Sequence, residues 1–381
     1  MLPGADELWA DLDPSVRHCN HGSYGAVTRP VREHRMALQL QAETNPNQWF
    51  RFELPERLEA ARRHMAAFVG VAPDNAVFVA NATSGVNVAL NAVRLHDGDE
   101  VIVTDHVYGA VLRTARRATD RVNGSTRIAA IDLLDDIDAH VDAFVSLANE
   151  KTRVAIVDHI ASPTGLVLPV TEIVGALRAR GVVTIVDAAH APGSRRLNVA
   201  DIGADFWTGN FHKWAAAPRP CAALAVSDEW RDRTQPLVAS FGLEDGFPNS
   251  FSWQGTDDYT AYLCLEPAVD ILESLGWDAL WHHNDELAAY GAQVVADRLG
   301  TEPALPTAAR GPMSLVALPD GLVTDDASAR ALIARVSQEL SVEVAVNPWR
   351  GGGYLRMSAH AYNDASDFDT LAKGLPDLLA G

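Results

Sequence analysis

The sequence predicts an α/β fold, in which a large domain with a mostly parallel sheet is followed by a smaller α+β domain. From residue 76 to residue 187, short apolar runs alternate with helical stretches, which is the pattern of parallel strands joined by helices on both faces of a sheet. The regular alternation ends after the apolar run 222–226. The length of 381 residues also exceeds what a single hydrophobic core ordinarily contains, so two domains are expected.

The first part of the chain is expected to be an irregular arm followed by two helices. Residues 1–29 mix small, polar and turn-forming side chains, which indicates either a surface loop or an arm over an active site. The apolar spacing predicts helices over 30–43 and 55–69, and Pro55 suits the first turn of the second helix. Between these helices, Asn45–Phe52 is expected to be an aromatic loop that carries one cation.

The alternating region is expected to form the sheet. Its predicted strands are 76–80, 100–104, 127–132, 153–158 and 182–186. The helices predicted between them are 84–94, 109–119, 138–149 and 170–180. In such sheets ligands bind at the carboxyl ends of the strands, so the polar residues that directly follow the strands are the candidates for a functional site.

The last part of the chain is expected to be mixed α and β. The predicted elements are helices 257–274 and 278–299, strand 313–318, helix 327–340, strands 342–347 and 353–358, and helix 366–379. We therefore expect an N-terminal arm (1–29), a large domain (30–265) and a small C-terminal domain (266–381) packed with the N-terminal segment.

Composition and charge narrow the classes of partner. The formal net charge of −19 disfavours nucleic acid or an anionic membrane as a partner, and no apolar run approaches the length of a membrane span. The acidic start of the chain lacks the basic and apolar regions of a signal peptide, so a cytoplasmic protein is expected. The three cysteines, Cys19, Cys221 and Cys264, indicate neither a disulfide framework nor a metal site.

Two residues carry the clearest chemical signal. Asp187 ends the apolar strand 182–186, and a buried carboxylate needs a partner. Lys213 lies between His212 and Trp214, and an amine beside aromatic side chains and a second potential cation can become nucleophilic. A carboxylate for a pyridinium nitrogen and an amine for a Schiff base are what a pyridoxal 5′-phosphate (PLP) enzyme needs. The alternatives are a capping or ion-paired Asp187 and an ordinary surface Lys213.

Four further features have both a functional and an ordinary interpretation. Asn81–Gly85 follows a strand and opens a helix, which suits a phosphate but also a simple helix cap. His106 follows the next strand and either lies flat against a pyridine ring or is a surface histidine. Ser162 lies in a turn and either meets a phenolic oxygen or serves the turn alone. Arg356 either binds a carboxylate in a bidentate manner or is a surface arginine.

The order of these features along the chain resembles that of the fold-type I PLP enzymes, and within them the class V aminotransferase family. Asn20–Gly25, Ser162–Gly165, Asp187–Gly193 and His212–Trp214 look like motifs of the isopenicillin N epimerase branch, and the resemblance covers nearly the whole chain. It implies the PLP-dependent transferase fold type I, with a sheet of the seven-stranded type in the large domain. It also implies a homodimer with active sites at the subunit interface.

The resemblance implies a role for each candidate residue. Lys213 would bind PLP covalently and move protons at the substrate α-carbon, and Asp187 would pair with the pyridine nitrogen. His106 would stack on the ring, with Tyr108 as its rival. The other implied roles are Ser162 and His190 at the phenolic oxygen; Thr83, Ser84, Asn210 and His212 at the phosphate; Thr256 at the neighbouring subunit's phosphate; Arg356 at the substrate carboxylate; and Tyr24, Arg51 and Tyr108 at the substrate.

Two departures from the family pattern bear on the reaction. Cysteine desulfurases of this class carry a nucleophilic cysteine shortly before the late arginine, but Asn347–Gly353 contains none, which disfavours persulfide chemistry. The epimerase branch usually has an arginine directly after the Asn-Pro of the N-terminal loop. Here Asn45-Pro46 is followed by Asn47 and Gln48, and Arg51 comes slightly later, so the substrate of the epimerases themselves is in doubt.

The sequence leaves several reactions open. The main hypothesis is a PLP enzyme of secondary metabolism that acts at the α-carbon of an amino acid or amino-acid conjugate, as an epimerase does. C–S β-lysis of a cysteine conjugate and decarboxylation coupled to oxidative deamination are alternatives on the same fold. A non-catalytic PLP-binding regulatory protein is a more remote alternative. A nucleotide-binding α/β protein of another class is disfavoured because the chain lacks the glycine-rich fingerprint.

Overall fold

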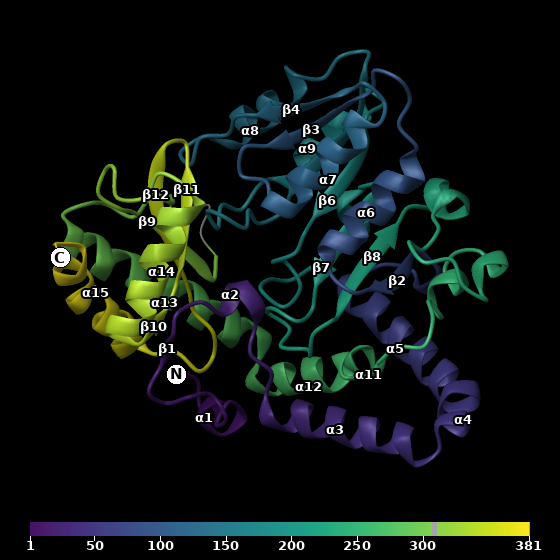
Figure 1. Ribbon diagram of the computed structural model, residues 1–381, viewed down its shortest axis with the longest axis horizontal. Helices are drawn as coiled ribbons and strands as arrows, with labels where there is room; N and C mark the ends of the chain where they lie inside the picture. The colour runs from purple at the N-terminus through teal and green to yellow at the C-terminus, as the bar shows by residue number, and fades with distance from the viewer. Residues whose placement is uncertain (307–310, 381) are drawn as a thin grey trace. The chain divides into compact units, whose positions relative to one another are not determined.

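The structure is a computed structural model that describes residues 1–306 and 311–380 (Figure 1). The chain divides into two compact units. The sheet unit comprises Pro30–Ile160 and Leu168–Asp270, and the terminal unit comprises Met1–Arg29, Ala161–Val167 and Ile271–Gly381. The sequence predicts a domain boundary at 265/266. In the structure the chain passes from the sheet unit to the terminal unit at 270/271, and residues 161–167 also belong to the terminal unit.

The sheet unit is built on seven strands in the order β2-β8-β7-β6-β5-β3-β4. The strands are β2 (Ala76–Val79), β3 (Glu100–Thr104), β4 (Ser125–Ala129), β5 (Thr152–Asp158), β6 (Val183–Asp187), β7 (Phe206–Asn210) and β8 (Ala222–Val226). Strand β8 pairs antiparallel with both of its neighbours, and all the remaining neighbouring pairs are parallel. The predicted α/β class with a large, mostly parallel sheet is therefore confirmed.

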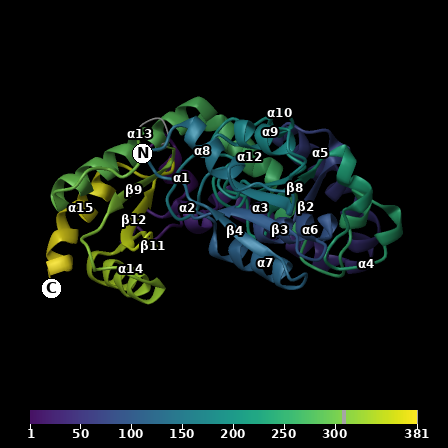
Figure 2. The same ribbon diagram turned by 90° about the horizontal axis from the view of Figure 1, so that it is seen from above.

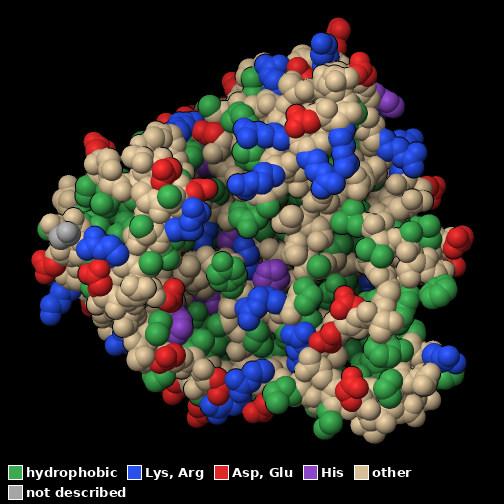
Figure 3. Space-filling view, in the orientation of Figure 1, with side chains coloured by type: hydrophobic (Ala, Val, Ile, Leu, Met, Phe, Trp, Pro, Cys, Tyr) green, Lys and Arg blue, Asp and Glu red, His purple; other side chains and the backbone are tan. Residues whose placement is uncertain are grey.

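Helices follow the strands because each carries one apolar face that the sheet can bury. The crossover helices are α6 (Ala82–Val93), α7 (Gly109–Asp120), α8 (Ile137–Val145), α9 (Val170–Arg178) and the short α10 (Val199–Ile202). Figure 2 shows α7 and α9 on opposite sides of strands β3 and β4. Helix α7 buries Val111 and Ala115, whereas Arg113, Arg116 and Arg117 are exposed. Figure 3 shows several Lys and Arg side chains on the face of the sheet unit that is turned to the viewer.

The sheet unit also contains helices that precede and follow the strands. They are α3 (Arg29–Thr44), α4 (Pro46–Gln48), η1 (Trp49–Glu53), α5 (Leu54–Val69), η2 (Pro73–Asn75), η3 (Asp228–Arg233), η4 (Leu243–Asp245), η5 (Asn249–Phe251), α11 (Thr260–Leu263) and α12 (Leu265–Leu275), the last of which crosses the division at 270/271. The expectation of an aromatic loop over 45–52 is wrong, because this stretch is helical. The side chain of Asn45 caps the helix by accepting from the Gln48 N–H, and Trp49 is buried.

The terminal unit contains a three-stranded antiparallel sheet of order β11-β12-β9. Its strands are β9 (Met313–Ala317), β11 (Ala345–Trp349) and β12 (Gly352–Ser358), and its long helices are α13 (Trp277–Leu299), α14 (Asp326–Leu340) and α15 (Ala365–Ala380). The N-terminal elements of this unit are α1 (Ala5–Leu8), β1 (Arg17–His18) and α2 (His21–Tyr24), and β1 pairs in parallel with β10 (Val342–Glu343).

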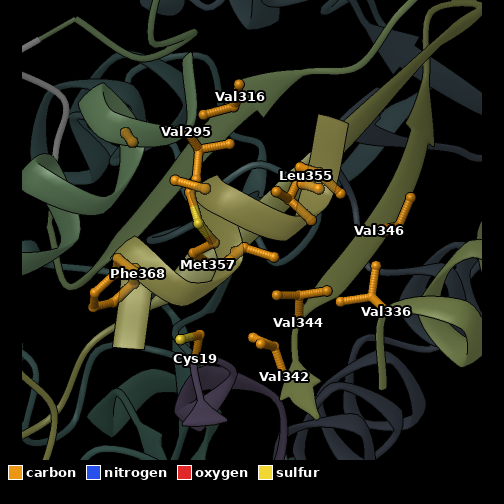
Figure 4. Close-up of a cluster of buried hydrophobic side chains, with 14 of the residues drawn as sticks. Cys19, Val295, Val316, Val336, Val342, Val344, Val346, Leu355, Met357 and Phe368 are labelled. Carbon is orange, nitrogen blue, oxygen red and sulfur yellow. The ribbon is translucent and has the colours of Figure 1, made fainter. Parts of the chain in front are cut away.

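The core of the terminal unit joins the two ends of the chain. Val295, Leu355, Met357 and Phe368 pack in one buried cluster, which also takes in Cys19 from the N-terminal segment (Figure 4). Burial raises the pKa of the Cys19 thiol well above its ordinary value, so Cys19 behaves as a small apolar side chain here. The segment that follows β1 is consequently held by the core. Within the described residues, no helix combines the length and the apolar character needed to cross a membrane.

Candidate active site

The carboxyl ends of three adjacent strands carry polar side chains. Asp158 ends β5, Asp187 ends β6 and Asn210 ends β7, and Asp158 is paired in register with Asp187. All three side chains are buried. Residues at the same register on neighbouring parallel strands point to the same face, so the two carboxyl groups lie side by side in an otherwise apolar sheet.

Asp187 is a buried carboxyl group with unused acceptor capacity. Its Oδ1 accepts the backbone N–H of Ala189 at 3.0 Å, and burial raises its pKa, which this bond and a positive charge on Lys213 oppose. Among the described contacts, no side chain bonds its other oxygen. A buried carboxylate of this kind is stabilised by a cationic donor. A protonated ring nitrogen is such a donor, so this residue fits the pyridinium of PLP.

Lys213 faces His190 across a short contact. The Nζ atom lies 2.9 Å from His190 Nε2, and Trp214 Nε1 lies 3.4 Å from His190 Nδ1. Because an indole N–H only donates, Nδ1 is the acceptor, and a neutral imidazole then carries its proton on Nε2. In this tautomer Lys213 Nζ accepts that proton as an uncharged amine, whereas a charged amine would donate to Nε2 of the other tautomer. An uncharged lysine amine is the nucleophilic form that Schiff-base chemistry uses.

A glycine turn brings Lys213 and His190 together. Gly193 follows His190 in a left-handed conformation with φ of +85°, and a Cβ at this position would lie 2.5 Å from the backbone of Trp214. Only glycine permits this approach between the loop after β6 and the loop after β7. The sequence supplies the glycine, but the contact that it allows is a property of the folded sheet unit.

The start of helix α6 is organised by two asparagines. The Asn81 side chain accepts from Ser84 N at 2.9 Å, and the Asn210 side chain accepts from Ala82 N at 2.9 Å. The N-cap residue is therefore Asn81, and Thr83 and Ser84 follow it in the helix. Both hydroxyls stand in the first turn, at the positive end of the helix dipole, where an anion is favoured.

Helix α6 also lies very close to β7. A Cβ on Gly85 would meet the Thr208 hydroxyl oxygen at 2.1 Å, so a larger residue would displace the helix. This glycine sets the distance between the first turn of α6 and the strand that leads to Lys213. Gly85 and Thr208 are structural positions that the sequence did not single out.

His106 is a buried side chain in this structure. Its side chain has 0% exposure, and its Nε2 donates to the Ile131 backbone oxygen at 2.8 Å. Tyr108, directly before α7, is 47% exposed. A residue that stacks on a cofactor must present one face of its ring, and Tyr108 is the more exposed of the two candidates. Both His106 and Tyr108 therefore stay candidates for the stacking residue.

Asp158 and Thr104 are functional candidates that the sequence analysis missed. Thr104 ends β3, and its hydroxyl donates to Asp158 Oδ2 at 2.6 Å. Burial and the neighbouring Asp187 raise the pKa of Asp158 to about 7. The signal was present in the sequence, because Asp158 ends an apolar strand in the same way as Asp187. Applying that rule to every strand would have found both acids.

We predict that Asp158 makes the apoprotein less stable as the pH rises. Folding raises its pKa from 3.8 to about 7, so the folded chain binds the proton more tightly than the unfolded chain. The stability from this proton is fully present below pH 3.8 and is lost as the pH approaches 7. Asp158→Asn should therefore increase the free energy of unfolding at pH 8 by roughly 1–3 kcal/mol, and by less at pH 5.

The measurement for this prediction is urea unfolding of the apoprotein at both pH values. Asp187 titrates in the same pocket, and Asp105 also acts on Asp158, so the wild-type slope is not due to Asp158 alone. The difference in the free energy of unfolding between Asp158→Asn and the wild type isolates the contribution of Asp158. A gain of the same size at pH 5 and pH 8 would contradict the assignment, because a titrating carboxyl group must produce a pH-dependent gain.

The terminal unit holds the arginine that the sequence proposed for a carboxylate. Arg356 on β12 is 4% exposed, and burial lowers the pKa of its guanidinium to about 10. Its Nη1 donates to the Ser162 carbonyl oxygen, and its Nη2 donates to Ser23 Oγ and to Asn20 Oδ1. Within the described residues, no carboxylate forms an ion pair with Arg356, and its Nε has no hydrogen-bond partner.

The structure distributes the predicted residues over both units. Ser162 and Arg356 lie together in the terminal unit, as does Tyr24, which is 74% exposed. The sheet unit brings together Lys213, His190 and Asp187 and, at the start of α6, Thr83, Ser84 and Asn210, with His212 beside Lys213. Arg51 and Thr256 line a different pocket of the sheet unit, of about 510 Å³, together with Phe50, Phe241 and Trp253.

Comparison with known proteins identifies relatives along almost the whole chain. The profile of the family described as Aminotransferase class-V matches residues 42–371. An isopenicillin N epimerase from Amycolatopsis lactamdurans is 30% identical over 389 residues, which cover 96% of each chain. An L-cysteine desulfhydrase from Arabidopsis thaliana is 27% identical over 413 residues, covering 98% of this chain and 90% of that protein.

Solved structures agree on the fold. The cystine C–S lyase C-DES, in complex with cysteine persulfide, has a TM-score of 0.84 at 18% identity and covers 97% of this chain and 99% of its own. A C-DES variant in which glycine is covalently linked to the PLP cofactor gives a TM-score of 0.85 at 18% identity, covering 98% and 99% of the two chains. At this level of identity the likeness concerns the fold.

Proposed function

Because the chain belongs to the class V aminotransferase family and is a PLP enzyme, we propose that it acts at the α-carbon of an amino acid or amino-acid conjugate, with epimerisation as the leading reaction. The observation that carries this proposal is the 2.9 Å contact between the Lys213 amine and His190, on the loops that follow β7 and β6, together with the buried Asp187 at the end of β6. The similarity to isopenicillin N epimerases at 30% identity over 96% of the chain supports the choice of reaction.

Two residues would control the protons of the reaction. Bound PLP supplies an electron-accepting ring that stabilises negative charge at the substrate α-carbon. Asp187 would accept a hydrogen bond from the ring nitrogen and, as a carboxylate in a buried site, would keep that nitrogen protonated. Lys213 would remove the proton from the α-carbon in its uncharged form, and its contact with His190 holds the amine in place. His190 donates from Nε2 and so orients the lysine.

The remaining cofactor contacts follow from the first turn of α6 and its surroundings. Thr83 and Ser84 offer hydroxyl and backbone donors to the phosphate, and Asn210 fixes the start of the helix through Ala82. His212 donates its Nδ1 proton to the Cys221 carbonyl oxygen at 3.2 Å, and burial followed by the Lys213 charge lowers its pKa to about 4. It can donate to the phosphate only as an imidazolium, which a bound dianion would favour.

Tyr108 is the ring-face residue in this proposal, and we predict that it contributes to PLP affinity. Tyr108→Ala should weaken PLP binding by about 3- to 10-fold, as expected for one lost aromatic contact, and Tyr108→Phe should restore it. His106→Ala is the matched comparison. It should lower the free energy of unfolding by about 1–3 kcal/mol, because it removes a buried hydrogen bond, and leave PLP affinity within about 2-fold.

The measurement is reconstitution of apoprotein with PLP, followed by the visible absorbance of the cofactor, with urea unfolding of each variant alongside. If His106→Ala weakened PLP binding and Tyr108→Ala did not, the assignment would be reversed and the buried histidine would have to turn toward the cofactor.

Arg356 is proposed as the group that binds the substrate carboxylate. A buried guanidinium that has hydrogen bonds only to uncharged oxygens keeps its charge available for an anion. Tyr24 and Arg51 remain substrate-binding proposals on the strength of the family resemblance. Ser162 accepts from Arg356 through its backbone oxygen, and its role at the phenolic oxygen is proposed on the strength of the family resemblance.

We also propose a homodimer. Phe241 is 93% exposed and Phe52 62% exposed, and Phe241 lines the same pocket as Arg51 and Thr256. A large aromatic side chain exposed to this extent next to an apolar pocket is typical of an interface rather than of a free surface. Thr256 lines that pocket without Lys213, which agrees with a role toward the neighbouring subunit's phosphate.

The experiment that tests the reaction is product analysis in D₂O with a panel of amino acids and cysteine S-conjugates. Epimerisation predicts deuterium at the α-carbon of recovered substrate together with inversion of configuration. C–S β-lysis is the second candidate, favoured by the similarity to an L-cysteine desulfhydrase and to a C–S lyase, and it predicts released thiol and a keto acid. Oxygen uptake would identify decarboxylation with oxidative deamination. Recovery of every substrate without deuterium would contradict α-carbon chemistry.

A further inference from the structure

The N-terminal segment Cys19–Tyr24 is bound firmly to the end of strand β12. Ser358 N donates to the Cys19 carbonyl oxygen at 2.8 Å, and Gly22 N donates to Ser358 Oγ at 3.0 Å. His21 stacks on His360 with ring centroids 3.9 Å apart and an interplanar angle of 18°. These contacts are all buried, and they fix helix α2 relative to the strand that carries Arg356. Buried contacts therefore hold this segment in place, whereas the first residues of a chain are usually poorly ordered.

The same segment supplies both side-chain acceptors of Arg356. Nη2 donates to Ser23 Oγ at 3.0 Å and to Asn20 Oδ1 at 3.3 Å. Ser23 Oγ in turn donates to Asn20 Oδ1 at 2.7 Å, so the two acceptors are held in one geometry. The Ser162 carbonyl oxygen accepts from Nη1 on the other side of the guanidinium. With both terminal nitrogens held, the plane of the group cannot rotate freely.

Each of these three acceptors is uncharged, although the chain has an excess of acidic residues. A carboxylate in place of the Asn20 amide would form an internal ion pair and neutralise the arginine. The observed acceptors hold the guanidinium without competing for its charge. Within the described residues, the buried Nε of Arg356 has no hydrogen-bond partner. An anionic ligand would supply both the missing hydrogen-bond acceptor for Nε and the missing negative charge beside the Arg356 guanidinium.

We propose that Asn20 and Ser23 are positioning residues that set the selectivity of this enzyme for substrates with an α-carboxylate. They fix the guanidinium plane of Arg356 through Nη2 and leave its charge and its Nε for the carboxylate. The inference rests on the proposed role of Arg356 and extends it to the N-terminal segment, which gains a specific function in recognition.

The test uses the PLP-loaded enzyme and two probes that differ only in the carboxylate, L-alanine and ethylamine. Their dissociation constants are measured from the visible absorbance of the cofactor, and the ratio of the two constants is the carboxylate selectivity. The wild-type enzyme should favour L-alanine by about 10- to 100-fold, the range expected for a charge-assisted hydrogen-bond pair. Arg356→Lys should remove most of this selectivity.

The positioning residues should change the selectivity without changing the binding of ethylamine. Ser23→Ala should reduce it by about 3- to 10-fold, since one hydrogen bond to the guanidinium is lost, and Ser23→Thr should retain it. Asn20→Asp should reduce it by about 10-fold or more, because the new carboxylate occupies the guanidinium. Ser15→Ala is the matched control, because Ser15 is exposed and bonds only Asp13 in the same N-terminal segment. It should leave both constants unchanged.

The outcomes separate this inference from the proposed function. If the wild type did not favour L-alanine, or Arg356→Lys kept the selectivity, the role of Arg356 itself would be wrong. If Arg356→Lys removed the selectivity while Ser23→Ala and Asn20→Asp kept it, Arg356 would bind the carboxylate without help from Cys19–Tyr24, and the inference would fail alone. Equal weakening of L-alanine and ethylamine in Ser23→Ala would show a general structural role and would also overturn it.

Discussion

Lys213→Ala is expected to abolish turnover, with a loss in kcat of about 10³-fold or more, because it removes both the covalent anchor of PLP and the proposed base. The variant should still bind PLP through the first turn of α6 and Asp187, but more weakly and reversibly. The chain contains three lysines, Lys151, Lys213 and Lys373, so the site of attachment can be determined without ambiguity. Borohydride reduction of the wild type followed by peptide mapping should place the cofactor on Lys213 alone.

The controls for this result are Lys151→Ala and Lys373→Ala. Both lysines lie outside the group formed by His190, Trp214 and Asp187, so each variant should keep wild-type kcat and the reducible bond to PLP. Reducible attachment that persisted in Lys213→Ala would refute the assignment. The physical basis is the position of the Lys213 amine, which lies 2.9 Å from His190 Nε2.

Asp187→Asn is expected to have opposite effects on the apoprotein and on the holoenzyme. In the holoenzyme it removes the carboxylate that keeps the ring nitrogen protonated, so kcat should fall by about 10²-fold or more. In the apoprotein it removes a buried carboxyl group whose pKa is raised by desolvation, so the free energy of unfolding near pH 8 should rise. The sign follows because a raised pKa makes the charged form unfavourable above the pKa.

The measurements are kcat, PLP affinity and urea unfolding of apoprotein and holoenzyme at pH 8. The matched variant is Asp158→Asn, which changes the neighbouring acid in register without touching the proposed ring-nitrogen partner. Asp158→Asn should also stabilise the apoprotein, yet it should keep most of the PLP affinity. If Asp187→Asn and Asp158→Asn reduced kcat equally, the two acids could not be assigned different roles.

The two acids together explain why this part of the sheet is sensitive to pH and to cofactor. Asp158 and Asp187 are neighbours in an apolar environment, where burial and the neighbouring Asp187 raise the pKa of Asp158 and burial raises that of Asp187. A cationic ring nitrogen at Asp187 offsets the cost of ionising that residue. We therefore expect the pH dependence of stability to be smaller in the holoenzyme than in the apoprotein. This difference is a consequence of the fold, because the acids are far apart in sequence.

Several features follow from the sequence alone because their physical causes are local. Alternating apolar strands and helices over 76–187 determine the α/β class, since an apolar strand is stable only when both faces are covered. The sequence alone also points to two candidate residues. These are Asp187, an acid at the tip of an apolar strand, and Lys213, an amine among aromatic side chains. The apolar pattern did not predict the helical structure of 45–52, because its start depends on the cap that Asn45 forms with the Gln48 N–H.

Only the tertiary structure decided which polar residues meet. It buried His106 against Ile131 and left Tyr108 exposed, although both follow the same strand. It set Asp158 beside Asp187, and it joined Asn20 and Ser23 to Arg356 from the opposite end of the chain. Residue type and periodicity report the burial of a segment, because burial depends on local apolar content. Hydrogen-bond partners depend on strand order, register and loop path, which are settled by packing between distant segments.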